Sequence, residues 1–141
     1  MKVKITRIDR GLPLPKYETS GAAAFDFITR QSVVVAPRSL ALAPSNVIIK
    51  VPRGYMLAVV SRSSTPRKKG LLIPHGLGII DNDYCGPEDE IMVQVYNFSD
   101  LPVKIERGER IAQGVFVKIA KGEFGESSIK NKTRGGFGST G

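Results

Sequence analysis

The sequence is poor in the residues that build disulfides, zinc centres and base-stacking surfaces. Its 141 residues include one cysteine (Cys85), one histidine (His75) and no tryptophan. A single cysteine excludes an internal disulfide and suits a reducing cytosol, so we expect a cytoplasmic protein. One histidine and one cysteine also argue against a zinc site made of such ligands. Aromatic residues make up only 7% of the chain, which disfavours a stacking platform for nucleic acid.

Long apolar runs are also missing. No stretch approaches the ~18 apolar residues that cross a bilayer, and the N-terminal residues lack the core of a signal peptide. We therefore expect no membrane partner. The sequence contains 41% hydrophobic and 24% charged residues. This composition is ordinary for one globular domain with a sizeable core.

Positive charge is in excess. The chain has 21 Lys and Arg residues against 13 Asp and Glu residues, a formal net charge of +8. Such an excess indicates a polyanionic partner, which is a nucleic acid, an anionic surface or a nucleotide polyphosphate. Net charge alone does not choose between them.

Short runs rich in Val and Ile, punctuated by Gly and Pro, predict an all-β sandwich or barrel. No long window has apolar residues at helical spacing, so any helix should be short, and Pro66 should stop the segment that precedes it. We divide the chain into a β domain at residues 1–120 and a C-terminal arm at residues 121–141. The expected strands lie at residues 3–8, 33–36, 47–51, 56–60, 91–97, 103–105 and 114–119.

Residues 78–86, with the sequence Gly-Ile-Ile-Asp-Asn-Asp-Tyr-Cys-Gly, place polar groups between short apolar residues and glycines. The β-branched Ile79 and Ile80 favour a strand, whereas Asn82 and Asp83 favour a turn. The pattern predicts a β-hairpin. Its two acids are either solvated on the surface or held at the mouth of a pocket.

Four further polar clusters are each open to two interpretations. Asp26 follows small residues and lies between two phenylalanines, either on the wet face of a strand or as a site carboxylate. Residues 61–65, Ser-Arg-Ser-Ser-Thr, form either an anion cradle or a solvated loop. Residues 108–113 offer a glycine, an arginine and the amide of Gln113 ahead of a strand. The glycine-rich residues 134–141 either wrap a phosphate or form a plain flexible tail.

These five clusters, in this order, resemble the five motifs of the homotrimeric dUTPase (deoxyuridine triphosphate nucleotidohydrolase) family. Each motif is short, but five in the right order are specific, and the likeness runs from Leu12 to the last residue. The resemblance implies a distorted jelly-roll β-barrel with a flexible C-terminal arm. It also implies a homotrimer whose active sites are shared at subunit interfaces. The matching residues are 23–27, 62–64, 78–86, 108–113 and 135–141.

The resemblance implies an activity as well. Members of this family hydrolyse dUTP to dUMP and pyrophosphate, with Mg²⁺ bound through the phosphates of the substrate. The reaction limits uracil in DNA and supplies dUMP for thymidylate synthesis. With dUTP as the substrate, we expect no stable nucleic-acid binding.

The matched motifs imply roles for individual residues. Asp81 would be the base that deprotonates the water attacking the α-phosphorus, while Asp83 would brace the hairpin. Tyr84 would lie against the deoxyribose and leave no room for a 2′-hydroxyl. Asp26 would orient the hydrated metal or pair with Arg110. The other implied positions are His75, Gly76, Gly78 and Ile80 for uracil, Arg62, Ser63, Ser64, Gln113 and Arg134 for phosphates, and Phe137, Gly138, Ser139 and Thr140 in the closing arm.

Several positions depart from the pattern of the family. Ala24 and Ser64 replace glycines, Cys85 replaces a frequent arginine, and His75 stands where an asparagine often holds the base. Either Lys132 or Arg134 would meet the γ-phosphate.

Two rival functions remain. A dCTP deaminase shares this fold and part of its motifs, but no glutamate lies in the third motif to carry out deamination, although Glu88 and Glu90 are close. The positive charge motivates a binding module that keeps the fold without catalysis, but Asp81, Tyr84, Gln113 and Phe137 are all present, which argues against it.

Overall fold

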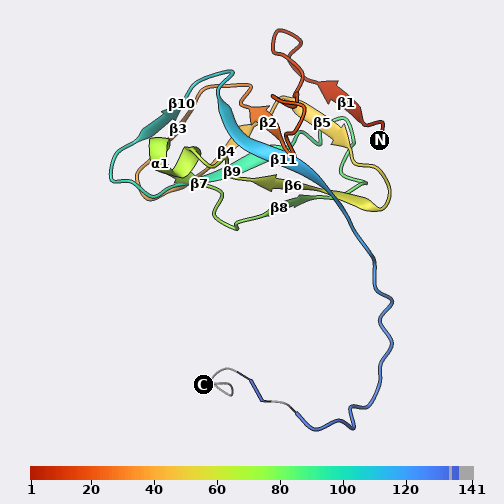
Figure 1. Ribbon diagram of the computed structural model, residues 1–141. Coiled ribbons are helices and arrows are strands. Elements are labelled where there is room, and N and C mark those ends of the chain that lie inside the picture. The colour runs from red at the N-terminus through yellow and green to blue at the C-terminus, as the bar shows by residue number, and fades with distance from the viewer. Residues whose placement is uncertain (134, 137–141) are drawn as a thin grey trace.

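Antiparallel β-structure dominates the computed structural model of the chain, which describes residues 1–133 and 135–136 (Figure 1). The all-β prediction is confirmed. Within the described residues no helix has the length and hydrophobicity that a bilayer crossing needs. In chain order, the elements are β1 (Lys4–Arg7), β2 (Phe25–Ile28), β3 (Val33–Val35), β4 (Leu40–Pro44), β5 (Val47–Lys50), β6 (Tyr55–Val60), α1 (Thr65–Lys69), β7 (Leu71–Leu72), β8 (Gly78–Ile80), β9 (Met92–Asn97), β10 (Val103–Ile105) and β11 (Arg110–Lys118).

The strands form two larger sheets and two short ribbons, and every pairing is antiparallel. One sheet has the strand order β2-β11-β6-β8, and the second has the order β4-β9-β7. The ribbons pair β1 with β5 and β10 with β3. Across the described residues these sheets do not join into one closed, hydrogen-bonded barrel. The expected jelly-roll barrel is therefore built from separate ladders around a common core.

The hydrophobic core is shared by the two larger sheets. Phe27 and Leu57 come from the four-stranded sheet, Leu71 and Val95 from the three-stranded one, and each is at most 1% exposed. All four belong to one buried cluster. Burying a side chain of this size contributes about 1.5–3 kcal/mol. The core therefore holds the two sheets together and fixes the strands that carry the polar motifs.

Each expected strand overlaps an observed one, but β4 and β7 were not expected. β4 contains alanines and a proline, residue types that are depleted in strands. It forms because it pairs with β9 along its length and buries Ala43. Tertiary pairing therefore overrides a weak local preference.

The short helix corrects the expectation for Pro66. This residue does not stop the chain but lies in the first turn of α1, where its fixed φ and missing N–H are tolerated. Gly70 ends the helix with a φ of +66° and donates its N–H to the carbonyl of Pro66 at 3.0 Å. The helix thereby spans the gap between β6 and β7.

Gly114, in the middle of β11, lets two aromatic rings pack against that strand. A Cβ at this position would lie 2.6 Å from Cζ of Phe25 and 2.8 Å from Cε2 of Phe27. The two rings meet edge to face, with centroids 5.2 Å apart. Because both rings belong to β2, this close approach holds β2 against β11, and Asp26 lies between them in the sequence.

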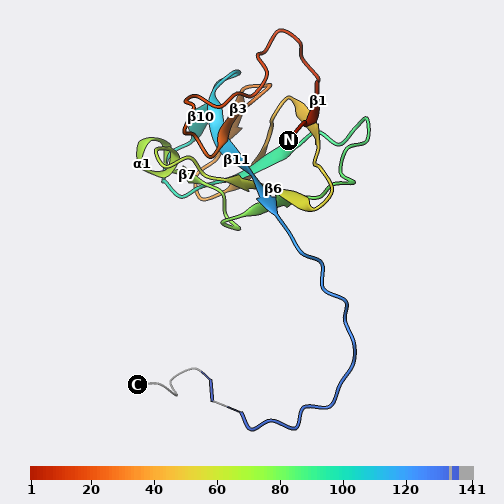
Figure 2. The same cartoon turned by 45° about the vertical axis from the view of Figure 1, so that its right-hand side comes forward.

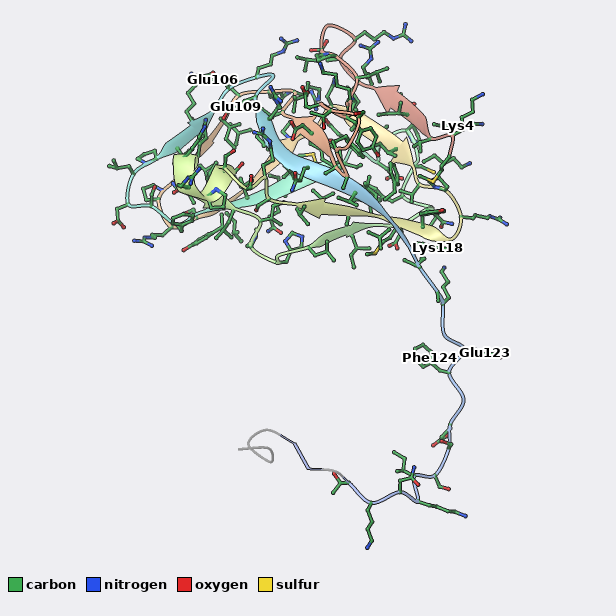
Figure 3. All side chains as sticks on the ribbon, viewed as in Figure 1. Lys4, Glu106, Glu109, Lys118, Glu123 and Phe124 are labelled. Carbon is green, nitrogen blue, oxygen red and sulfur yellow. The ribbon has the colours of Figure 1, made fainter. Side chains whose placement is uncertain are left out.

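Beyond β11, the described residues leave the body as an extended segment in which they form neither helix nor strand, and Figures 1 and 2 show this from two directions. Glu123 and Phe124 of this segment lie well away from the sheets (Figure 3). The Phe124 side chain is fully exposed.

Candidate active site

Strand β11 brings residues of three motifs to one place in the four-stranded sheet. It lies between β2 and β6, so Gln113 is opposite Asp26 on one side and Val60 on the other. Val60 ends β6, and residues 61–64 follow it directly. The expectation that Gln113 precedes its strand is wrong, because β11 begins at Arg110 and places Gln113 inside the ladder.

A β-bulge in β11 sets the direction of Arg110. The register with β2 shifts between Arg110 and Ala112, which makes Ile111 the extra residue. Both Ile111 and Ala112 are buried in the core. Because side chains alternate along a regular strand, the extra residue returns Arg110 to the face that carries Asp26.

Asp26 is held between two arginines. Its Oδ1 accepts a hydrogen bond from Nε of Arg62 at 2.8 Å, and its Oδ2 accepts one from Nη1 of Arg110 at 3.1 Å. The side chain of Asp26 is 16% exposed and that of Arg62 is 27% exposed, so the pair is partly shielded from water. A hollow of about 250 Å³ borders Asp26 and Arg110. The predicted pairing of Asp26 with Arg110 is confirmed, and Arg62 joins it.

Ser63 and Ser64 present hydroxyl groups beside this cluster. Ser64 occupies the N-cap position of α1 but makes no side-chain cap hydrogen bond. Ser61, by contrast, accepts the N–H of Ile73 on its Oγ at 2.9 Å and a bond from Gln113 Nε2 on its carbonyl at 3.2 Å. Ser61 therefore ties the strands together, while Ser63 and Ser64 make no side-chain hydrogen bond within the described part of the chain.

The hairpin expected at residues 78–86 is wrong. Only residues 78–80 form a strand, β8, and this strand pairs with β6 rather than with a return strand of its own. Residues 81–91 form a loop. Gly86 donates its N–H to Oδ2 of Asp89 at 2.6 Å, and this side-chain contact turns the chain where a second strand was expected.

The turn before β8 places His75 over the backbone of Gly78. Gly76 has a φ of +70°, a conformation that glycine adopts without strain, and Leu77 donates its N–H to the carbonyl of His75 at 2.7 Å. A Cβ on Gly78 would lie 3.3 Å from Nε2 of His75 and 3.4 Å from Cβ of Val59. The imidazole therefore covers the stretch that the family resemblance assigns to uracil.

Asp81 and Asp83 differ from Asp26 because their carboxylates have no partner among the described residues. Both residues are exposed, and neither side chain forms a hydrogen bond or ion pair within the described residues. Asp83 contributes its main-chain carbonyl, which accepts the N–H of Cys85 at 2.9 Å. The expectation that the Asp83 side chain braces the segment is therefore corrected, since in the described residues it touches no donor.

A buried ion pair that the sequence did not reveal supports the loop instead. The Glu90 carboxylate accepts hydrogen bonds from Nη2 of Arg30 at 2.8 Å, from Nε of Arg30 at 3.1 Å and from the N–H of Asn46 at 2.7 Å. The hydrogen bonding of Arg30 with the Glu90 carboxylate raises the pKa of Arg30. The Tyr84 hydroxyl donates to the carbonyl of Glu90 at 3.2 Å, which ties its ring to the same residue. Nothing in the acidic run at residues 88–90 indicates which acid is buried.

Asp81 and Gln113 lie toward opposite ends of β6 in the four-stranded sheet. β8 and β11 flank β6, with Ile80 opposite Leu57 and Gln113 opposite Val60. From the residue rise along a strand and the spacing between strands, Asp81 lies on the order of 15 Å from Gln113. Within one chain, Asp81 therefore does not lie next to Gln113 and Asp26, although Gly78 at the start of the third motif does lie near the end of β6.

The positions expected to close the site lie outside the described residues, and they are Arg134, Phe137, Gly138, Ser139 and Thr140. Within residues 1–133 and 135–136, no group of three His, Cys, Asp or Glu side chains is arranged around a metal position. Both oxygens of Asp26 already accept a guanidinium N–H, but each has further lone-pair capacity. Asp26 therefore fits a water ligand of hydrated Mg²⁺ better than a direct bond to the ion.

Comparison with known proteins decides the family. The dUTPase family model matches residues 10–141. The chain belongs to the dUTPase family. A deoxyuridine 5′-triphosphate nucleotidohydrolase of Lactococcus lactis is 39% identical over 134 residues, which cover 93% of this chain and 89% of that protein. The family expected from the five motifs is thereby confirmed, and dUTP diphosphatase activity is supported with it.

Solved structures agree with this assignment. The crystal structure of a dUTPase from Streptococcus mutans matches with a TM-score of 0.78 at 33% identity, covering 85% of this chain and 98% of that chain. The dUTPase of Staphylococcus bacteriophage 80alpha with dUpNHpp matches with a TM-score of 0.84 at 25% identity, covering 99% of this chain and 98% of that chain. The separate β-ladders described above are thus the family's fold.

Proposed function

We propose that the protein hydrolyses dUTP to dUMP and pyrophosphate, with Asp81 as the base that takes a proton from the attacking water. The observation that carries this proposal is the family match over residues 10–141, within which the five motifs follow in order. The water oxygen bonds to the α-phosphorus, the bond from the α-phosphorus to the bridging oxygen breaks, and pyrophosphate leaves. An exposed carboxylate without a partner suits Asp81 to this task, because a general base needs an oxygen within reach of water.

Asp26, Arg62, Ser63, Ser64, Arg110 and Gln113 form what we call the sheet cluster. This cluster would bind the phosphates. Ser63 and Ser64 have free hydroxyls in the described residues, and Gln113 keeps one amide N–H beyond the bond it makes to Ser61. Arg62 would supply positive charge while its Nε stays bound to Asp26. The ion pair fixes the guanidinium in advance, so less side-chain entropy is lost when a phosphate binds.

His75, Gly76, Gly78, Ile80, Asp81 and Tyr84 form what we call the loop cluster. This cluster would bind the nucleoside. The backbone around Gly76, Gly78 and Ile80, with the imidazole of His75 above it, would read the edge of uracil. Such a site rejects cytosine because its buried polar groups would remain unpaired. Tyr84 would lie against the deoxyribose, and its hydrogen bond to the Glu90 carbonyl would hold the ring in a position that excludes a 2′-hydroxyl.

A homotrimer with shared active sites would join the two clusters. The distance between Asp81 and Gln113 within one chain, on the order of 15 Å, supports a site that a second subunit completes. The extended segment after β11 supports an arm that reaches across to another subunit, with Phe137 stacking on uracil and Gly138 and Ser139 closing on the phosphates. Deleting residues 132–141 should then leave a folded trimer with severely reduced turnover, measured by pyrophosphate release and sedimentation. Unchanged turnover would remove the arm from the mechanism.

Mg²⁺ would enter with the substrate and neutralise charge on its phosphate oxygens. Asp26 would hold one of the water ligands of the ion.

A cytoplasmic location agrees with the single, free cysteine.

The deciding experiment is a turnover assay with dUTP and dCTP, first with Mg²⁺ and then with a chelator, in which pyrophosphate and ammonia are both measured. We expect pyrophosphate from dUTP only, and a large loss when the metal is removed. Ammonia from dCTP would replace the proposal with a deaminase. The ion pair between Glu90 and Arg30 counts against that rival, because Glu90, one of the two glutamates near the third motif, is already engaged.

A further inference from the structure

Basic residues without a partner gather at one edge of the body. A hollow of about 530 Å³ is bordered by Lys2, Lys4, Lys50 and Arg53, and one carboxylate, Asp83, lines it. None of the four cations forms an ion pair within the described residues. Basic residues elsewhere in the body are often paired, as Arg30 is with Glu90 and Lys69 is with Glu109. A distinct part of the net charge of +8 therefore lies unneutralised at this hollow.

The ladder between β1 and β5 forces two of these cations together. Lys4 is directly opposite Lys50 in the register. Val3 and Ile5, on either side of Lys4, pack against the core, so the lysine faces away from it. Like charges directly opposite each other across two strands are destabilising. An anion bound between them would remove that repulsion.

The same edge continues to the root of the arm. Ile119 donates its N–H to the carbonyl of Gly54 at 2.9 Å, which places the end of β11 beside Arg53. Lys118, the last residue of β11, is exposed, and Figure 3 shows Lys4 and Lys118 on the same side of the body. We call Lys2, Lys4, Lys50, Arg53 and Lys118 the basic edge.

We infer that the basic edge binds the phosphodiester backbone of single-stranded nucleic acid, weakly and without base preference. The cations come from three separate parts of the chain, which are residues 2–4 at β1, residues 50–53 at the end of β5, and Lys118 at the end of β11. No aromatic residue is among the described residues that line the hollow, so bases have nothing to stack on. The surface would therefore recognise only the negative charge of the phosphates. Non-specific binding of this kind has dissociation constants of about 10⁻⁴–10⁻⁶ M at physiological salt. Such weak binding agrees with the expectation of no stable complex.

The test is fluorescence anisotropy with a labelled thymidylate oligonucleotide and the full-length protein. Three to five phosphate contacts would weaken binding about 20- to 100-fold when salt rises from about 50 to 200 mM. The double variant Lys4→Glu/Lys50→Glu should lower affinity at low salt at least about tenfold. The matched control is Arg67→Glu/Lys68→Glu, which makes the same change in net charge on the exposed face of α1 and should lower affinity less than about twofold.

Three results would overturn the inference. Equal losses in both double variants would mean that the net charge acts as a whole and no local surface exists. Absence of binding at low salt would remove the interaction, and capture by phosphatidylglycerol vesicles without oligonucleotide binding would make the surface a membrane contact.

If the glutamate variant fails to fold, Lys4→Gln/Lys50→Gln serves instead. It should keep or raise the melting temperature because it removes the repulsion, while still weakening binding. Turnover of dUTP should be unchanged in all of these edge variants, so the outcome is independent of the proposed hydrolysis.

Discussion

Two aspartates in the two halves of the candidate site show how the fold separates structural from chemical roles. Asp26, in the sheet cluster, accepts hydrogen bonds from Arg62 and Arg110 and is only 16% exposed. Asp81, in the loop after β8, is exposed and has no partner in the described residues. The same side chain is therefore a fixed acceptor in one place and an available base in the other. Four predictions follow this contrast from its largest consequence to its smallest.

Asp81→Asn should lower turnover by about 10²–10⁴-fold, because the amide no longer takes a proton from water. Stability should not change, since the carboxylate holds nothing in the described structure. Pyrophosphate release gives the rate, binding of dUpNHpp shows that the site remains, and thermal unfolding shows that the fold remains. Asp83→Asn is the matched control, because it lies in the same loop and is also exposed. A similar loss of rate in both variants would remove the distinction between the two acids.

Asp26→Asn should lower the free energy of unfolding by about 1–3 kcal/mol, because two partly shielded guanidinium groups lose their charged acceptor. Its control is Asp100→Asn, whose pair with Arg38 is open to water and should contribute about 0–1 kcal/mol. Urea unfolding measures both. Equal stability changes would show that partial shielding from water does not strengthen the ion pairs of Asp26.

Glu90→Gln should loosen the loop and lower the free energy of unfolding by about 1–3 kcal/mol, because Arg30 loses its buried charged partner. The preference for dUTP over UTP should fall at the same time, since Tyr84 is tied to this residue. The competing rates of dUTP and UTP hydrolysis measure the preference. Glu88→Gln, on an exposed neighbour, should alter neither quantity. A destabilised variant with unchanged preference would separate Glu90 from the positioning of Tyr84.

The smallest effect concerns pH. The pKa of Asp9 is lowered mainly by a hydrogen bond from Arg107 and, to a smaller extent, by one from the Gly11 N–H. The pKa of Glu106 is lowered mainly by a hydrogen bond from Lys104 and, to a smaller extent, by one from Ser32. A lowered pKa in the folded state stabilises the protein above the unfolded value, about 4, and this stabilisation is lost as pH falls through the folded value. Unfolding in urea should therefore become slightly easier below about pH 4. Asp9→Asn should flatten that dependence, and a steeper one would contradict the assignment.

The features that sequence predicts best here are those that depend on neighbouring residues. Val- and Ile-rich runs between turn residues located most of the strands, and the order of five short motifs identified the family. Pro66 was misjudged because proline stops a helix from within but suits its first turn, and only the surrounding chain decides which applies. β4 was missed because its alanines carry little strand preference of their own, and its pairing with β9 supplies the rest.

The contacts inside the candidate site were less accessible, because they join residues far apart in the chain. The Asp26–Arg110 pair was one of two alternatives in the sequence, and the contact with Arg62 was not expected. Glu90 was considered only as an acid close to the third motif, yet it is buried against Arg30, sixty positions away. No local pattern marks a carboxylate for burial when its acidic neighbours at positions 88 and 89 are equally polar.

By itself, the sequence determined the all-β class, most strand positions, the family and the excess of positive charge. These depend on side-chain type, local periodicity and motif order. The tertiary structure alone decided that the 78–86 segment is a strand and loop instead of a hairpin, that a bulge at Ile111 returns Arg110 to Asp26, and that Asp81 lies far from Gln113. It also decided that Lys4 and Lys50 face each other. Each of these depends on the register between distant strands, which burial of the shared core selects and no single stretch of sequence contains.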